Sequence, residues 1–91
     1  MDTRVAIISI IVEDLNVANQ INNLLHECSK YIIGRMGLPY RQKNISIISI
    51  ALDAPQDAIN ALSGKIGRLA GVSAKIAYSN VITRESDIEN A

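Results

Sequence analysis

The stretch IIGRMGLPYR, which covers residues 32–41, holds the side chains best suited to binding a ligand. It contains Arg35, Tyr40 and Arg41, and guanidinium groups pair well with carboxylate or phosphate groups. This grouping predicts a binding site for an anion or for an anionic partner. The alternative is that these side chains form a charged edge that is exposed to solvent and binds nothing.

Two carboxylates, Glu13 and Asp14, follow the first apolar run of the chain. Paired carboxylates are able to do general acid–base chemistry. They also end a strand well, and their negative charge favours the start of a helix through its dipole. We prefer the second interpretation, and we include both residues in the predicted ligand site as groups that reach it at a subunit interface.

The sequence predicts neither catalysis nor a metal centre. His26 is the only histidine and Cys28 the only cysteine, and residues two apart on a helix do not face each other. A metal site needs several converging ligands, so we expect no metal, no cofactor and no catalytic residue. An acylphosphatase-like enzyme would need a glycine-rich loop with a catalytic arginine near its N-terminus, and MDTRVAIISIIVED contains no glycine.

Apolar periodicity predicts four strands and two helices. Strands are expected over residues 4–12, 31–36, 44–52 and 72–79, and helices over 16–29 and from 53 or 54 to 69. In the connection between the middle strands, Gly37 permits a positive φ, Pro39 stiffens the chain and Asn44 closes the turn. Gly71 suits a left-handed residue after the second helix. We expect one domain over residues 1–79 and a mobile polar tail over 80–91.

The chain contains an internal repeat. The segments IISIIVEDLNVANQI (7–21) and IISIALDAPQDAINA (47–61) are offset by 47 − 7 = 40 residues, and each reads as a strand, an acidic stop and an amphipathic helix. Two such units predict an α+β, ferredoxin-like β-α-β-β-α-β sandwich. In this fold two helices cover one face of a four-stranded antiparallel sheet.

Both faces of the predicted sheet are apolar, although a sheet with one wet face should alternate apolar and polar residues. The face toward the helices takes Ile8, Ile10, Val12, Ile48, Ile50 and Leu52. The other face takes Val5, Ile7, Ile11, Ile45 and Ile47. Leaving each such side chain in water forgoes about 1.5–3 kcal/mol. We therefore expect a homo-oligomer, a dimer or tetramer, with these five residues at its interface.

Composition narrows the function further. The formal net charge is +0 and 48% of the residues are hydrophobic, so direct binding to nucleic acid is not expected. The chain has no apolar run near the ~20 residues that cross a bilayer, so we expect no membrane association. A single cysteine suits a reducing cytoplasm.

The segments GRMGLPYR and LDAPQDAI…LSGKIG, within the run HECSKYIIGRMGLPYRQKNISIISIALDAPQDAINALSGKIG, resemble the iron-only hydrogenase system regulators. The resemblance covers about residues 4–79. It implies an ACT-like variant of the ferredoxin-like fold, similar to the metal-sensing, tetramerising domain of the nickel-responsive repressor. ACT-like relatives bind small effectors between subunits, whereas the nickel ligands of the repressor have no counterparts here.

These observations together predict a non-catalytic, cytoplasmic regulatory or sensory module. It is expected to be a homo-oligomer that binds a small effector or a protein partner. The alternative is a scaffold subunit that binds only other proteins and no small molecule. Arg35, Tyr40 and Arg41, with Glu13 and Asp14, are the residues expected to bind a ligand.

Overall fold

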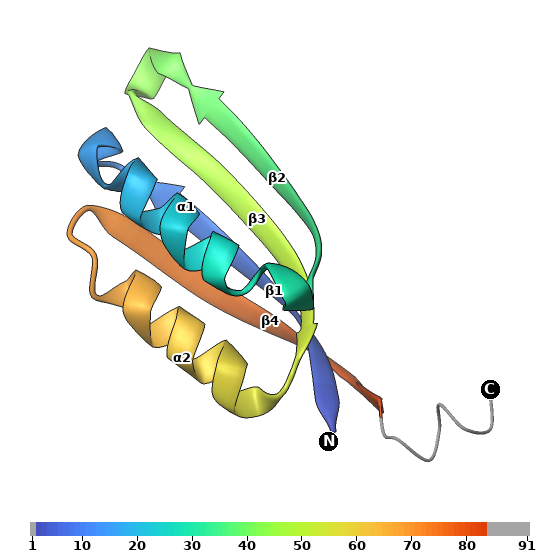
Figure 1. The fold of residues 1–91 in the computed structure, drawn as a ribbon. Coiled ribbons are helices and arrows are strands. Elements are labelled where there is room, and N and C mark those ends of the chain that lie inside the picture. Colours follow the sequence, from blue (N-terminus) through green and yellow to red (C-terminus); the bar gives the residue numbers. More distant parts are fainter. Residues whose placement is uncertain (1, 84–91) are drawn as a thin grey trace.

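The computed structural model describes residues 2–83. The elements, in chain order, are β1 (Thr3–Val12), η1 (Leu15–Val17), α1 (Ala18–Glu27), η2 (Ser29–Tyr31), β2 (Ile32–Tyr40), η3 (Arg41–Lys43), β3 (Ile45–Ala54), α2 (Gln56–Gly67) and β4 (Val72–Thr83). Each η segment is a single 3₁₀ turn. The strands form one antiparallel sheet in the order β2-β3-β1-β4, and both helices lie on the same face of it (Figure 1). The predicted α+β, ferredoxin-like fold is confirmed.

The two central strands set the register of the sheet. Ile8 of β1 lies opposite Ile50 of β3, and Ile10 lies opposite Ile48. Because side chains alternate between the faces of a strand, this register points all four isoleucines toward the helices. Each is buried, and three of them are 0% exposed.

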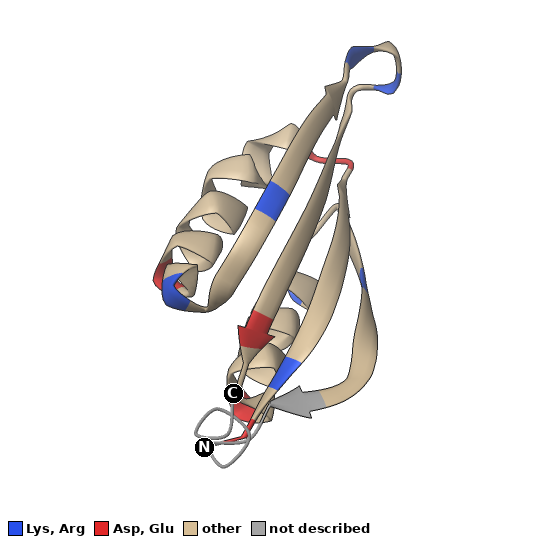
Figure 2. Ribbon diagram, turned by 90° about the vertical axis from the view of Figure 1, so that its right-hand side faces the viewer, with Lys and Arg blue, Asp and Glu red and all other residues tan. Residues whose placement is uncertain are grey.

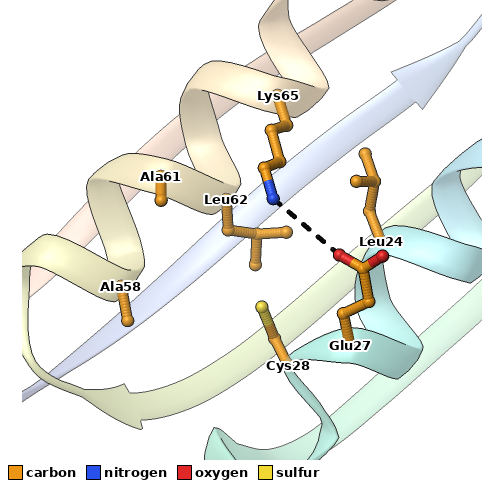
Figure 3. A pocket seen from close by; sticks show the side chains of 7 residues that line it. All are labelled: Leu24, Glu27, Cys28, Ala58, Ala61, Leu62 and Lys65. Atoms are coloured by element: carbon orange, nitrogen blue, oxygen red, sulfur yellow. Dashed lines mark ion pairs between the residues drawn. The ribbon is translucent and has the colours of Figure 1, made fainter.

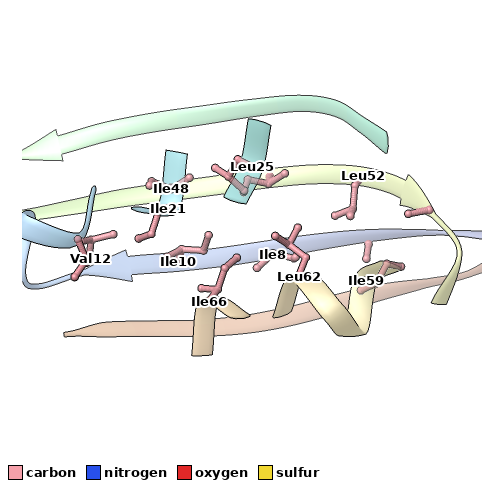
Figure 4. Close-up of a cluster of buried hydrophobic side chains, with 14 residues drawn as sticks. Ile8, Ile10, Val12, Ile21, Leu25, Ile48, Leu52, Ile59, Leu62 and Ile66 are labelled. Atoms are coloured by element: carbon pink, nitrogen blue, oxygen red, sulfur yellow. The ribbon is translucent and has the colours of Figure 1, made fainter. Parts of the chain in front are cut away.

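The helices complete the core from the other side. The buried residues of α1 are Ile21 and Leu25, and those of α2 are Ile59, Leu62 and Ile66. They recur every three or four positions, which places them on one face of each helix. The core is aliphatic throughout, as a chain without Phe or Trp requires (Figure 4).

The second strand is longer than the sequence indicates. It was expected to end at Met36, but β2 continues to Tyr40, which pairs with Ile45 of β3. Pro39 is tolerated inside β2 because β2 is an edge strand, where a missing N–H breaks no ladder bond on the open side. The expected positive φ at Gly37 is therefore wrong, since this residue lies in extended backbone.

The connection from β2 to β3 is correspondingly short. It consists of η3 and Asn44, which has a φ of 59° and turns the chain in the left-handed conformation. The role predicted for Asn44 is confirmed. At the other end of the chain, β4 includes residues 80–83, which were expected to begin the tail, and the remaining tail residues 84–91 lie outside the described residues.

Gly71 joins the end of α2 to the end of β1. Its φ is 72°, as predicted for a left-handed residue. Its carbonyl accepts the backbone N–H of Glu13 at 2.7 Å and that of Asp14 at 3.3 Å. A Cβ atom at this position would lie 2.6 Å from the Asp14 Cβ, so both the conformation and the contact require glycine.

This contact makes a stability prediction. We expect Gly71→Ala to lower the free energy of unfolding by about 2 kcal/mol or more, because it adds left-handed strain to a steric clash. Gly64→Ala is the matched control, since its Cβ would meet only the end of the Arg68 side chain at 3.9 Å inside α2. This control should gain about 0.5–1 kcal/mol. Urea denaturation at one fixed protein concentration measures both, and equal effects would contradict the assignment.

Candidate functional site

Arg35 lies on the helix side of the sheet. It pairs with Ile50, whose side chain is buried under the helices. The Arg35 Nη2 atom donates a hydrogen bond to the Asn22 Oδ1 atom of α1 at 3.0 Å. Arg35 therefore links the edge strand β2 to α1 in this structure.

Tyr40 lies on the opposite side of the sheet. It is five residues after Arg35 in a strand, and an odd separation places two side chains on opposite faces. The Tyr40 hydroxyl bonds to the Gln42 Oε1 atom within the hairpin. The structure therefore does not bring Arg35 together with Tyr40, although the two are close in sequence.

Arg41, Glu13 and Asp14 lie at the same end of the sheet as Tyr40. Arg41 begins η3, and the basic residues of this turn lie at the tip of the hairpin (Figure 2). The carboxylates follow β1 at the end where it meets β3 beside the hairpin. The Asp14 Oδ1 atom accepts the backbone N–H of Asn16 at 3.0 Å, so this side chain caps η1. Anion binding here stays a prediction, with Tyr40 and Arg41 as its grouped members.

The most extensive surface feature is the face of the sheet opposite the helices, which we call the open face. Its exposed large apolar side chains are Ile7 (44%), Ile11 (42%), Met36 (53%), Leu38 (52%) and Tyr40 (40%). Leu38, Ile47 and Ile11 form one continuous row across β2, β3 and β1. No helix or strand within residues 2–83 covers this face.

The predicted interface residues all belong to the open face. Ile7 and Ile11 are exposed, and Val5, Ile45 and Ile47 are half-buried among their neighbours. Met36 and Leu38 were missed, because their segment was assigned to a connection. Their alternation with Tyr40 at every second position was the signal that β2 continues.

A second feature is a cleft between the two helices, with a volume of about 240 Å³. We call it the interhelical cleft. It is lined by Leu24, Glu27, Cys28, Ala58, Ala61, Leu62 and Lys65. The Cys28 thiol points into it, and the Lys65 Nζ and Glu27 Oε2 atoms approach to 3.8 Å across it (Figure 3). The sequence gave no sign of this cleft, because its two sides are far apart in the chain.

A third cluster joins the N-terminal end of α2 to β4. The Arg4 guanidinium lies 4.2 Å from the centre of the Tyr78 ring, and its Nε donates to the Ser79 carbonyl at 3.2 Å. The Gln56 Nε2 atom donates to the Tyr78 hydroxyl at 3.0 Å. Because these groups satisfy one another, the cluster holds the irregular part of β4 in place and offers no free binding group.

Two kinds of site are absent from the described region. Residues 2–83 contain no group of three or more His, Cys, Asp or Glu side chains placed to hold a metal ion. Among the helices of the same region, none is long and apolar enough to cross a membrane.

Comparison with known proteins identifies relatives. Residues 4–76 match the model of the TM1266-like family, described as "Iron-only hydrogenase system regulator, putative". The solved structure of the uncharacterized protein TM1266 from Thermotoga maritima is 39% identical, with a TM-score of 0.80 over 84% of this chain and 96% of that one. No curated protein matches.

Two more distant structures share the fold alone. A formyltetrahydrofolate deformylase from Pseudomonas putida KT2440 has a TM-score of 0.62 at 14% identity, over 85% of this chain and 29% of the deformylase chain. An unknown protein from Galdieria sulphuraria has a TM-score of 0.57 at 10% identity, over 91% of this chain and 48% of its own. Their functions therefore say nothing about this chain.

The placement of the arginines makes a test of anion binding possible. We expect inorganic phosphate to shift the backbone amide resonances of η3 in a ¹⁵N-HSQC titration, since the basic side chains Arg41 and Lys43 belong to this turn. Arg41→Ala should remove most of the shift. Arg35→Ala is the control and should leave it intact, because Arg35 lies on the other face of β2. Absence of any shift would support the charged-edge alternative.

Proposed function

Because this chain belongs to the TM1266-like family of iron-only hydrogenase system regulators, we propose that it is a regulatory module that acts without catalysis as a homo-oligomer. Two copies pack through the open face, and a small effector modulates the assembly. The single free cysteine suits the reducing cytoplasm, where we place this regulator.

The observation that carries this proposal is the apolar character of the open face. Its large side chains are 40–53% exposed in the single chain. Fully burying one such side chain stabilises by about 1.5–3 kcal/mol, so covering several half-exposed ones contributes several kcal/mol. A soluble monomer rarely leaves this much contiguous apolar surface uncovered.

The size of the open face suits a small stable interface. Four strands spaced about 4.8 Å apart, each about ten residues long, present about 600 Å². Two copies would then bury about 1,200 Å² in total, at the lower end of specific interfaces. Strong apolar character compensates for the modest area.

Charge also favours a second copy as the occupant. The open face carries Ser9 and Ser49 between its apolar rows, and Lys75 lies at its β4 edge. In a two-fold interface each patch meets itself, so an uncharged centre avoids like-charge repulsion. An acidic or basic partner would find little to pair with there.

The open face predicts the effect of a charged substitution on assembly. We expect native mass spectrometry and light scattering to show an oligomer, and Leu38→Lys to raise its dissociation constant about a hundredfold or more, because like charges would be buried together at the interface. Far-UV circular dichroism should be unchanged, since Leu38 is 52% exposed.

The matched control is Leu15→Lys. Leu15 is 47% exposed, but it lies in η1, outside the sheet, so its substitution should leave the oligomer intact. A parent chain that is monomeric at cellular concentrations would contradict the proposal. The scaffold alternative, in which the open face binds a different protein, would then be preferred.

A further inference from the structure

We infer that the interhelical cleft binds a small zwitterion with an apolar body, and that this ligand is the effector of the regulator. The inference rests on the proposed regulatory function and adds the place and the chemistry of the effector. It is carried by the volume of the cleft, its apolar lining and the pair of opposite charges across it.

The volume limits the size of the ligand. An engineered apolar cavity of about 150 Å³ holds one benzene molecule. The interhelical cleft, at about 240 Å³, therefore has room for a somewhat larger body with a charged head group. Drug-sized ligands and nucleotides need larger pockets, of about 300–1,000 Å³.

The lining favours an aliphatic body. Leu24 of α1 and Ala58, Ala61 and Leu62 of α2 supply most of the wall. The two alanines leave the space that longer side chains would fill. Leu62 is 2% exposed and belongs to the core, so a bound ligand would rest on a part of the fold that cannot move away.

The charges define the head group. The Lys65 Nζ and Glu27 Oε2 atoms are 3.8 Å apart, and their side chains are 52% and 62% exposed. A pair this long and this exposed contributes little to stability, so each partner is available to a ligand. A carboxylate on the ligand would pair with Lys65, and an ammonium group would pair with Glu27 (Figure 3).

A ligand with only one charge suits the cleft less well. An anion that pairs with Lys65 would lie beside the Glu27 carboxylate, and a cation that pairs with Glu27 would lie beside the Lys65 ammonium. A zwitterion gives both groups an opposite charge and repels neither. Charge complementarity therefore selects molecules that carry both signs.

The cleft and the open face lie on opposite sides of the sheet. A ligand in the cleft contacts α1 and α2 together, and it does not compete with a second copy at the open face. Effector binding and assembly can therefore be measured separately on the same protein.

Three molecules of nearly the same shape provide the test. L-Leucine carries both charges, 4-methylpentanoate lacks the ammonium group and 3-methylbutylamine lacks the carboxylate. We expect leucine to bind with a dissociation constant on the order of 1 mM, as suits a molecule of about nine heavy atoms, and the other two about tenfold more weakly. ¹⁵N-HSQC titration of the full chain measures all three constants.

The single cysteine offers an independent readout. Because Cys28 is the only thiol of the chain and lines the cleft, leucine should slow its reaction with a disulfide reagent such as DTNB. Lys65→Met and Glu27→Gln should each weaken leucine binding about tenfold. Ala61→Leu should abolish it by filling the cleft, and because Ala61 is exposed this variant should fold normally. Lys43→Met, in the distant η3, is the control and should have no effect.

The outcomes separate the two proposals. Leucine binding that the cleft variants weaken and the control does not would support the effector site, whatever the oligomeric state. Equal binding of the three molecules, or no leucine binding at 20-fold the expected constant, about 20 mM, would overturn it. Native mass spectrometry of the same samples reports assembly, so a monomer that binds leucine would contradict only the proposed oligomer.

Discussion

The antiparallel register between β1 and β3 is the constraint on which the rest of this structure depends. Ile8 opposite Ile50 and Ile10 opposite Ile48 place four isoleucines in the core. A slip of one residue would turn all of them to the other face, because the side-chain period of a strand is two. The same register decides which apolar side chains remain on the open face, so core and surface are set by one pairing.

The two helices cover only one side of this sheet. Their apolar faces bury the core, and the small side chains Ala58 and Ala61 leave the interhelical cleft on the outside of the helix layer. The opposite side of the sheet stays uncovered within residues 2–83. A regulator needs one surface that responds to a signal and one that transmits it, and this layered arrangement provides two surfaces with the core between them.

Much of the fold could be predicted from periodicity and turn chemistry. The buried stripe Ile59, Leu62 and Ile66 and the left-handed residues Asn44 and Gly71 were all readable, because each depends on local spacing or on backbone conformation. The extent of β2 was not readable. Glycine and proline are typical of turns, and only pairing with β3 on one side of an edge strand makes Pro39 acceptable there.

The sequence by itself determined the fold class, the two apolar faces of the sheet and the family resemblance, since these follow from residue types and their order. Tertiary structure alone decided which side chains meet. Arg35 and Tyr40 are close in sequence but lie on opposite faces of β2, since a strand alternates its side chains. Lys65 and Glu27 are far apart in sequence but lie 3.8 Å apart, because both helices pack on the same face of the sheet.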